Sequence, residues 1–184
     1  MRNFLLSALI LGALFSCKKE QKPAENPVVT TTETPTPTSA YKTVEFTTDK
    51  VANLVNTKND TLYITNFFAT WCGPCMKEIP HFKKKMEELK GQPVKFTFIS
   101  VDEKNDWETE VKNFAEEQGL SKNVVVLNGA TLSPEFFKAN FKEWDGSSIP
   151  FTQMRKGDVT DETVGMMTED VLNEKVSKFL TAKK

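Results

Sequence analysis

Cysteine and histidine are scarce in this sequence of 184 residues, which contains three cysteines and a single histidine. A structural zinc ion requires four ligands, most often thiolates and imidazoles. Cys72 and Cys75 could supply two ligands and His81 a third, but no second ligand pair follows. We therefore expect no structural zinc. Two thiolates suit Cu(I), so a copper-carrying role remains an alternative.

An excess of charge of either sign is also lacking, because 24 Lys and Arg residues face 25 Asp and Glu residues and the formal net charge is -1. Proteins that bind nucleic acid through its phosphates usually present a basic surface. The charge balance gives no sign of such a partner. With 39% hydrophobic and 27% charged residues, the composition is that of an ordinary globular protein with enough length for a core.

The sequence has no apolar run of the roughly 20 residues that a membrane-spanning helix needs. The run at residues 4–15 is shorter, follows the positive Arg2 and ends at Ser16-Cys17, which is the layout of a secretory signal. Residues 14–17 resemble a bacterial lipobox, in which the cysteine is lipidated and begins the mature protein. We expect residues 1–17 to be a lipoprotein signal peptide with Cys17 as the lipidation site. The alternative is an incidental cysteine in a signal cleaved elsewhere.

Residues 18–40 consist mainly of Thr, Pro, Glu and Lys and contain no aromatic side chain. A segment of this composition cannot bury enough apolar surface to offset the entropy lost on ordering. We predict a disordered tether over residues 18–40 and one folded domain over residues 41–184.

Strand-like and helix-like patterns alternate through the folded part. Short apolar segments rich in β-branched and aromatic residues predict buried strands, and Ile149 to Val164 reads as a hairpin with a turn at Lys156-Gly157-Asp158. Apolar residues at three- and four-residue steps predict helices. The expected strands cover residues 62–68, 94–101, 124–127, 149–154 and 159–164, and the expected helices cover residues 74–90, 106–118, 132–141 and a last segment around residues 172–179. This alternation predicts an α/β domain with a mixed central sheet flanked by helices.

The two remaining cysteines, Cys72 and Cys75, lie between the first predicted strand and the helix that begins near Pro74. A disulfide across a two-residue spacer closes so small a loop that it is a poor structural staple, which indicates a reactive role. At the helix N-terminus, unpaired N–H groups and the positive end of the helix dipole should lower the pKa of the Cys72 thiol toward about 7. We expect Cys72 to attack a partner's disulfide and Cys75, turned inward, to resolve the mixed disulfide.

The segment at residues 66–75, Asn-Phe-Phe-Ala-Thr-Trp-Cys-Gly-Pro-Cys, resembles the thioredoxin superfamily, and the continuation Met-Lys-Glu-Ile-Pro resembles its exported TlpA/ResA-like branch. That branch includes cytochrome c maturation reductases. The resemblance implies a thioredoxin fold with an extra strand-helix insertion before the last hairpin. It also implies a thiol-disulfide oxidoreductase that needs no cofactor, with Trp71, Gly73 and Pro74 supporting the cysteine pair.

The resemblance also assigns a role to Ile149-Pro150, which stands where the family has a cis-proline facing the cysteines. A cis bond there would leave the preceding backbone open to a substrate strand. An ordinary trans proline ending a loop is the alternative. Isoleucine before this proline resembles the reducing thioredoxins, which favours a reductase over an oxidase.

Glu78 matches an acidic residue that lies near the active site in reductases of this branch, whereas the alternative is an ordinary glutamate on a charged helix surface. Asn66 departs from cytoplasmic thioredoxins, which have a buried, proton-accepting aspartate at this position. Because asparagine cannot accept that proton, proton transfer from Cys75 would fall to Glu78 or to water. A Glu78→Gln variant should then react more slowly with disulfides.

Together these observations predict a membrane-anchored enzyme of the bacterial cell envelope that faces the periplasm and reduces disulfides of protein substrates. Its role would be cytochrome c maturation or general thiol redox maintenance. We expect a monomer that draws electrons from a membrane partner of the thiol-disulfide type. The alternatives are a Cu(I) metallochaperone that uses the same cysteine pair and a thiol peroxidase.

Overall fold

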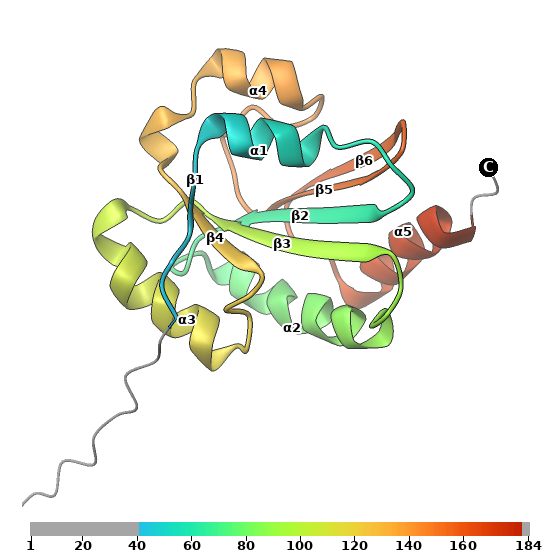
Figure 1. Ribbon diagram of the computed structural model, residues 1–184, viewed down its shortest axis with the longest axis horizontal. Coiled ribbons are helices and arrows are strands. Elements are labelled where there is room, and N and C mark those ends of the chain that lie inside the picture. The colour runs from blue at the N-terminus through green and yellow to red at the C-terminus, as the bar shows by residue number, and fades with distance from the viewer. Residues whose placement is uncertain (1–40, 182–184) are drawn as a thin grey trace, which may run out of the picture. The chain divides into compact units, whose positions relative to one another are not determined.

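The computed structural model describes residues 41–181, which form a six-stranded sheet flanked by helices (Figure 1). The strands are β1 (Glu45–Phe46), β2 (Leu62–Phe68), β3 (Val94–Ser100), β4 (Val124–Leu127), β5 (Phe151–Lys156) and β6 (Val159–Val164). The helices are α1 (Thr48–Val55), α2 (Gly73–Glu88), α3 (Lys112–Glu117), α4 (Pro134–Asn140) and α5 (Glu169–Thr181). No helix among these residues is long and apolar enough to cross a membrane.

The strand order is β1-β4-β3-β2-β5-β6. Strands β1 to β4 pair in parallel, whereas β5 is antiparallel to both β2 and β6. Central strand β2 is buried over nearly its whole length, as expected for a strand that is covered on both faces. The predicted mixed, helix-covered sheet is therefore confirmed, and it is a thioredoxin-like fold.

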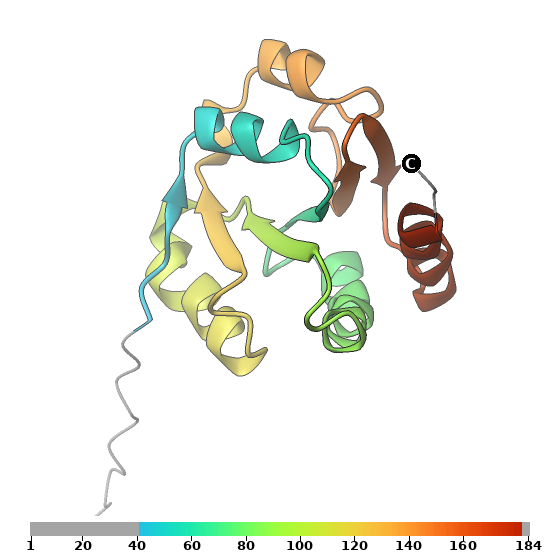
Figure 2. The ribbon, with the colours of Figure 1, turned by 45° about the vertical axis from the view of Figure 1, so that its right-hand side comes forward.

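Helices cover both faces of this sheet. In the turned view, α1 and α4 lie on one side and α2, α3 and α5 on the other (Figure 2). Successive residues of a strand point to opposite faces, so Phe67 and Phe68 belong to different cores. Phe68 packs with Phe82 and the α2 layer, while the Phe67 ring centroid lies 4.6 Å from that of Trp144 on the α4 side. The end of β2 is thus fixed from both faces.

Two elements were not predicted. Strand β1 has two residues, too few to show an alternating pattern, and it pairs with β4 at the edge of the sheet. Helix α1 has eight residues and is held by Thr47, whose side chain accepts a hydrogen bond from the Lys50 N–H. Both are short, and their stability comes from packing rather than from sequence propensity.

The predicted helix at residues 106–118 differs from the observed structure. It opens with a 3₁₀ turn (Lys104–Asp106) and a π-helical turn (Trp107–Val111), and regular α-helix begins only at Lys112. The predicted side chains are nevertheless on the inner side, because Trp107 and Val111 are buried. Elsewhere the boundaries shift slightly: β5 begins at Phe151 rather than at residue 149.

Candidate active site

The site is built where β2 ends and α2 begins. After Phe68, the Cys72 N–H donates to the Ala69 carbonyl oxygen at 3.1 Å and closes a tight turn. Helix α2 then starts at Gly73 with Pro74 in its first turn, where a missing N–H costs nothing. Cys72 is the N-cap: its Sγ accepts a hydrogen bond from the Cys75 N–H at 3.2 Å. The sequence therefore places a sulfur atom at the positive end of a sixteen-residue helix.

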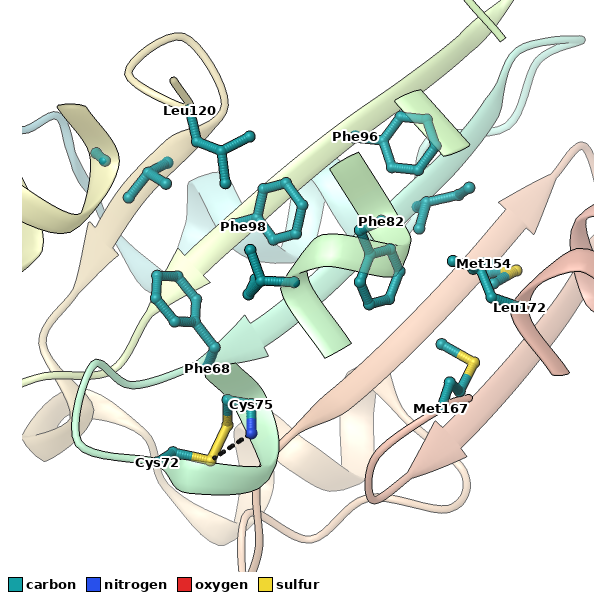
Figure 3. Packing of buried hydrophobic residues seen from close by; sticks show 14 of the residues in the cluster. Phe68, Cys72, Cys75, Phe82, Phe96, Phe98, Leu120, Met154, Met167 and Leu172 are labelled. Atoms are coloured by element: carbon teal, nitrogen blue, oxygen red, sulfur yellow. Dashed lines mark hydrogen bonds between the residues drawn. A yellow bond between two sulfur atoms is a disulfide. The ribbon is translucent and has the colours of Figure 1, made fainter. Parts of the chain in front are cut away.

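Cys72 and Cys75 form a disulfide, with their Cα atoms 5.2 Å apart (Figure 3). The two residues differ in access, because Cys72 retains 5% of its accessible surface and Cys75 none. Trp71, directly before the pair, is 70% exposed and is the most exposed large hydrophobic residue described. The cysteine pair thus lies at the surface with only one of its members open to a partner.

The Ile149-Pro150 peptide bond is cis, as predicted. The Ile149 carbonyl oxygen lies 3.9 Å from Cys72 Sγ, so this segment borders the accessible sulfur. The Pro150 carbonyl oxygen accepts a hydrogen bond from the Gly165 N–H at 2.8 Å, just beyond the end of β6. The loop before β5 and the end of β6 therefore meet beside the cysteines.

Glu78 is fully buried on α2, one turn after Cys75. Its Oε1 accepts a hydrogen bond from Asn66 Nδ2 and its Oε2 accepts one from the Met167 N–H, both at 2.8 Å. Burial raises the pKa of this carboxyl to about 7, although the two hydrogen bonds favour the charged form. A group with this pKa can both accept and release a proton near neutral pH.

Asn66 connects this carboxyl to the sheet. Its Nδ2 also donates to Thr152 Oγ1 at 2.9 Å, across the β2–β5 pair. Its Oδ1 is buried and has no hydrogen-bond partner. Because the amide can rotate to offer Oδ1 instead of Nδ2, Asn66 can pair with either protonation state of Glu78.

The family of the chain follows from sequence comparison, since residues 33–140 match the AhpC/TSA family. The chain belongs to this family. It is 27% identical over 133 residues to thiol-disulfide oxidoreductase ResA of Bacillus subtilis (strain 168), which covers 71% of this chain and 68% of that protein. ResA of Halalkalibacterium halodurans is 28% identical over 111 residues, which cover 59% of this chain and 57% of the relative.

Solved structures agree with these relatives. A thiol:disulfide interchange protein of the thioredoxin family from Chlorobium tepidum TLS is 29% identical, with a TM-score of 0.54 over 66% of this chain and 81% of that one. A thioredoxin-related protein from Neisseria meningitidis serogroup B is 26% identical, with a TM-score of 0.53 over 69% of this chain and 90% of that one. The protein is therefore a thiol-disulfide oxidoreductase with the redox pair Cys72–Cys75.

The structure of this AhpC/TSA-family oxidoreductase brings most of the predicted site residues together. Trp71, Cys72, Gly73, Pro74 and Cys75 form the turn and the first turn of α2, and Ile149 and Pro150 border them. The interpretation of Glu78 as a helix-surface residue is wrong, because its side chain has no exposed surface.

The remaining predictions concern metal and lipid. Among residues 41–181, no group of three or more His, Cys, Asp or Glu side chains is placed to hold a metal ion. His81 lies farther along α2, where its Nδ1 is 3.8 Å from Glu169 on α5. Cys17, the predicted signal peptide and the predicted tether lie outside the described residues.

Sequence reasoning missed three partners of the site: Thr152 on β5, the Met167 backbone after β6, and Asp102 after β3, which binds Thr70. No local motif marks them, since each meets its partner, which is Asn66, Glu78 or Thr70 respectively, only in the folded protein.

Proposed function

We propose that this oxidoreductase reduces disulfides of protein substrates, with Cys72 as the attacking thiol and Cys75 as the resolving thiol. The observation that carries the proposal is the asymmetry of the pair: Cys72 is the accessible member and its Sγ receives the Cys75 N–H at the helix N-terminus. A sulfur so placed is favoured as a thiolate, and the thiolate is the nucleophile in disulfide exchange.

The reaction balances within the pair and its substrate. The Cys72 thiolate attacks one sulfur of a substrate disulfide, the substrate S–S bond breaks, and the other substrate sulfur leaves as a thiolate. Cys75 then loses its proton and attacks Cys72 Sγ, which releases the second substrate thiol. The enzyme is oxidised by two electrons and the substrate is reduced by two, so a reductant of the thiol class must regenerate the enzyme.

Glu78 is our candidate for the group that accepts the Cys75 proton. Positions 75 and 78 are one turn apart on the same face of α2, and both side chains are buried. The pKa of Glu78, about 7, suits acceptance and later release of a proton near neutral pH. Asn66 can remain hydrogen-bonded to Glu78 before and after the transfer.

The setting of the reaction is also proposed. The lipobox-like sequence at Cys17 supports a lipid anchor in the bacterial cell envelope, with the domain facing the periplasm. The Gly73-Pro74 spacer and Ile149 resemble reducing thioredoxins, which supports the reducing direction. A membrane partner of the thiol-disulfide type would supply electrons, and the protein clients would belong to cytochrome c maturation or general thiol maintenance.

Trapping tests the cysteine roles most directly. In a Cys75→Ser variant of the full chain, the mixed disulfide with the substrate should accumulate, because the resolving thiol is gone. It can be isolated on non-reducing gels and its partner identified by mass spectrometry. A Cys72→Ser variant is the matched control and should trap nothing and lose turnover of insulin disulfides. Retained turnover in Cys72→Ser would refute the proposed mechanism.

The same preparations separate the alternatives. A Cu(I) metallochaperone would take up one equivalent of Cu(I) and form no mixed disulfide with any protein of a cell extract. A thiol peroxidase would consume hydrogen peroxide rapidly through a sulfenic acid on one cysteine. Insulin reduction that persists in excess copper chelator, without peroxide consumption, would support the reductase.

A further inference from the structure

Asp102 is a buried carboxylate directly after β3, with 1% of its surface exposed. Both of its side-chain oxygens accept the Thr70 N–H, at 3.1 and 3.0 Å, and Oδ1 also accepts the Thr70 hydroxyl. The Ser100 hydroxyl donates to Oδ2 at 2.7 Å. No ion pair within residues 41–181 includes this carboxylate, so neutral donors from two neighbouring strand ends stabilise its charge.

Thr70 is the first central residue of the turn that delivers Cys72. The last backbone bond of the β2–β3 ladder runs from the Val101 N–H to the Phe68 carbonyl oxygen at 2.9 Å. The turn then closes from the Cys72 N–H to Ala69, which leaves the Thr70 N–H without a backbone partner in the turn. The Asp102 carboxylate accepts the Thr70 N–H instead, so a side chain continues the hydrogen bonding between the ends of β2 and β3.

Asp102 is itself held in position. Its N–H donates to Ser100 Oγ at 3.2 Å, and its carbonyl oxygen accepts the Trp107 Nε1–H at 3.0 Å. Trp107 is buried at the start of the irregular helix that precedes α3. Asp102 is thus anchored both at the end of β3 and by the irregular helix before α3, whereas the turn it binds carries the most exposed residue of the site, Trp71.

We propose that Asp102 is a positioning residue for the oxidoreductase reaction. It holds the turn at residues 69–72 so that Cys72 Sγ stays at the N-terminus of α2, within reach of the Cys75 N–H. This inference rests on the proposed role of Cys72 as the attacking thiol. Asp102 touches neither sulfur directly and acts through Thr70.

The chemistry of the cluster requires a carboxylate. An ionised aspartate only accepts hydrogen bonds, so it can serve the Thr70 N–H, the Thr70 hydroxyl and the Ser100 hydroxyl together. An asparagine at position 102 would direct its own NH₂ toward at least one of these donors. The turn would then lose a charge-assisted contact and move relative to the helix. Displacements of about 1 Å can cost about 100-fold in rate, so a partly released turn should cost about 10-fold.

Two substitutions test the proposal in the full-length enzyme. Asp102→Asn should lower kcat/KM for insulin reduction about 10-fold, and Thr70→Val, which removes only the hydroxyl donor, about 3-fold. Thr70→Ser keeps both donors and should restore the wild-type rate. If Asp102→Asn does not fold, the Thr70 pair alone decides the outcome.

A second measurement reports the reactivity of the Cys72 thiol without any protein substrate. In each reduced variant, iodoacetamide alkylation of the peptide that contains Cys72 is followed by mass spectrometry from pH 5 to 9. The apparent pKa of Cys72 should rise and alkylation at pH 7 should slow by the same factors as turnover. Ser133→Ala removes the N-cap of α4, a helix that contributes no hydrogen bond to the Asp102–Thr70 cluster, and is the destabilised control. It should lower Tm and leave both readouts unchanged.

The outcomes are separable. If Asp102→Asn and Thr70→Val lower Tm as Ser133→Ala does but leave alkylation and kcat/KM at the wild-type values, the positioning role of Asp102 is refuted. Retained turnover in Cys72→Ser would instead refute the proposed function, whatever the alkylation rates show.

Discussion

Neutralising Glu78 should remove a specific pH dependence from the stability of the protein. The pKa of this carboxyl is raised from 4.5 to about 7 because the side chain is buried. The folded protein therefore holds the proton more tightly than the unfolded chain does. The contribution of protonated Glu78 to the free energy of unfolding is therefore present in full below pH 4.5 and is lost as the pH rises through 7. The separation of the two pKa values corresponds to about 3 kcal/mol.

Glutamine is a suitable replacement because it reproduces the neutral form. Its Oε1 can accept the Met167 N–H, and its amide can donate to Asn66 Oδ1, the buried acceptor that now has no partner, once the Asn66 amide rotates. The Glu78→Gln variant should therefore fold, and should match the wild type most closely in stability at low pH.

The assay is chemical denaturation of the oxidised protein at several pH values between 4.5 and 8.5. The free energy of unfolding of the wild type minus that of Glu78→Gln should fall by about 3 kcal/mol across this range, with most of the change between pH 5 and 8. Other carboxyls titrate alike in both proteins and cancel in the difference. Glu87→Gln, on the same helix but 78% exposed, is the matched control and should give a flat difference.

A difference that varies by less than about 0.5 kcal/mol would refute the raised pKa of Glu78 and the proton transfer built on it. The same variant also tests the chemistry. If Glu78 accepts the Cys75 proton, Glu78→Gln should reduce disulfides more slowly than the wild type at pH 7. Unchanged kinetics would leave water as the acceptor.

Gly146→Ala should lower the free energy of unfolding by about 3 kcal/mol in denaturation experiments. Gly146 has φ +85°, and an added Cβ would lie 2.3 Å from the Phe137 ring. The control Gly119→Ala also has positive φ but no atom within 4 Å of the added Cβ, so it should lower the free energy of unfolding by about 1 kcal/mol. Equal costs would show that the Phe137 ring yields freely. In a bacterial host, Cys17→Ala should abolish lipid labelling and move the protein from the detergent phase to the aqueous phase, and unchanged partitioning would refute lipidation at Cys17.

The sequence predicted the elements whose pattern is strong and local. Strands β2 and β4 have the predicted bounds, because continuous apolar runs between polar segments leave little freedom in placing a buried strand. Helix α2 begins at Gly73, one residue before the start that Pro74 indicated. The short elements β1 and α1 escaped prediction because their stability depends on β4 and on the core that α1 shares with α4, both far along the chain.

The site residues likewise differ in how far local sequence could predict them. Cys72 and Cys75 stand in a local motif that marks them as a redox pair, and the family resemblance, rather than a local pattern, predicted the cis bond before Pro150. The burial of Glu78 could not be derived, since its neighbour Lys77 gives the helix a solvent-exposed appearance. Its partner Met167, whose N–H binds the buried carboxylate, lies 89 residues farther along the chain. The pKa of Glu78 is therefore a property of the tertiary structure.

Asn66 affects how many ionisable groups share the buried site around Glu78. A carboxyl at position 66 would share the buried site with Glu78, and two adjacent carboxylates in one site cannot both ionise readily near neutral pH. With asparagine on β2, Glu78 is the one ionisable side chain of the Asn66–Glu78 pair, and it lies on the same helix as Cys75. The amide can follow that proton by rotating, while Thr152 can donate to or accept from it in either orientation. In the proposed mechanism, the departure from a buried aspartate leaves either Glu78 or water to accept the Cys75 proton.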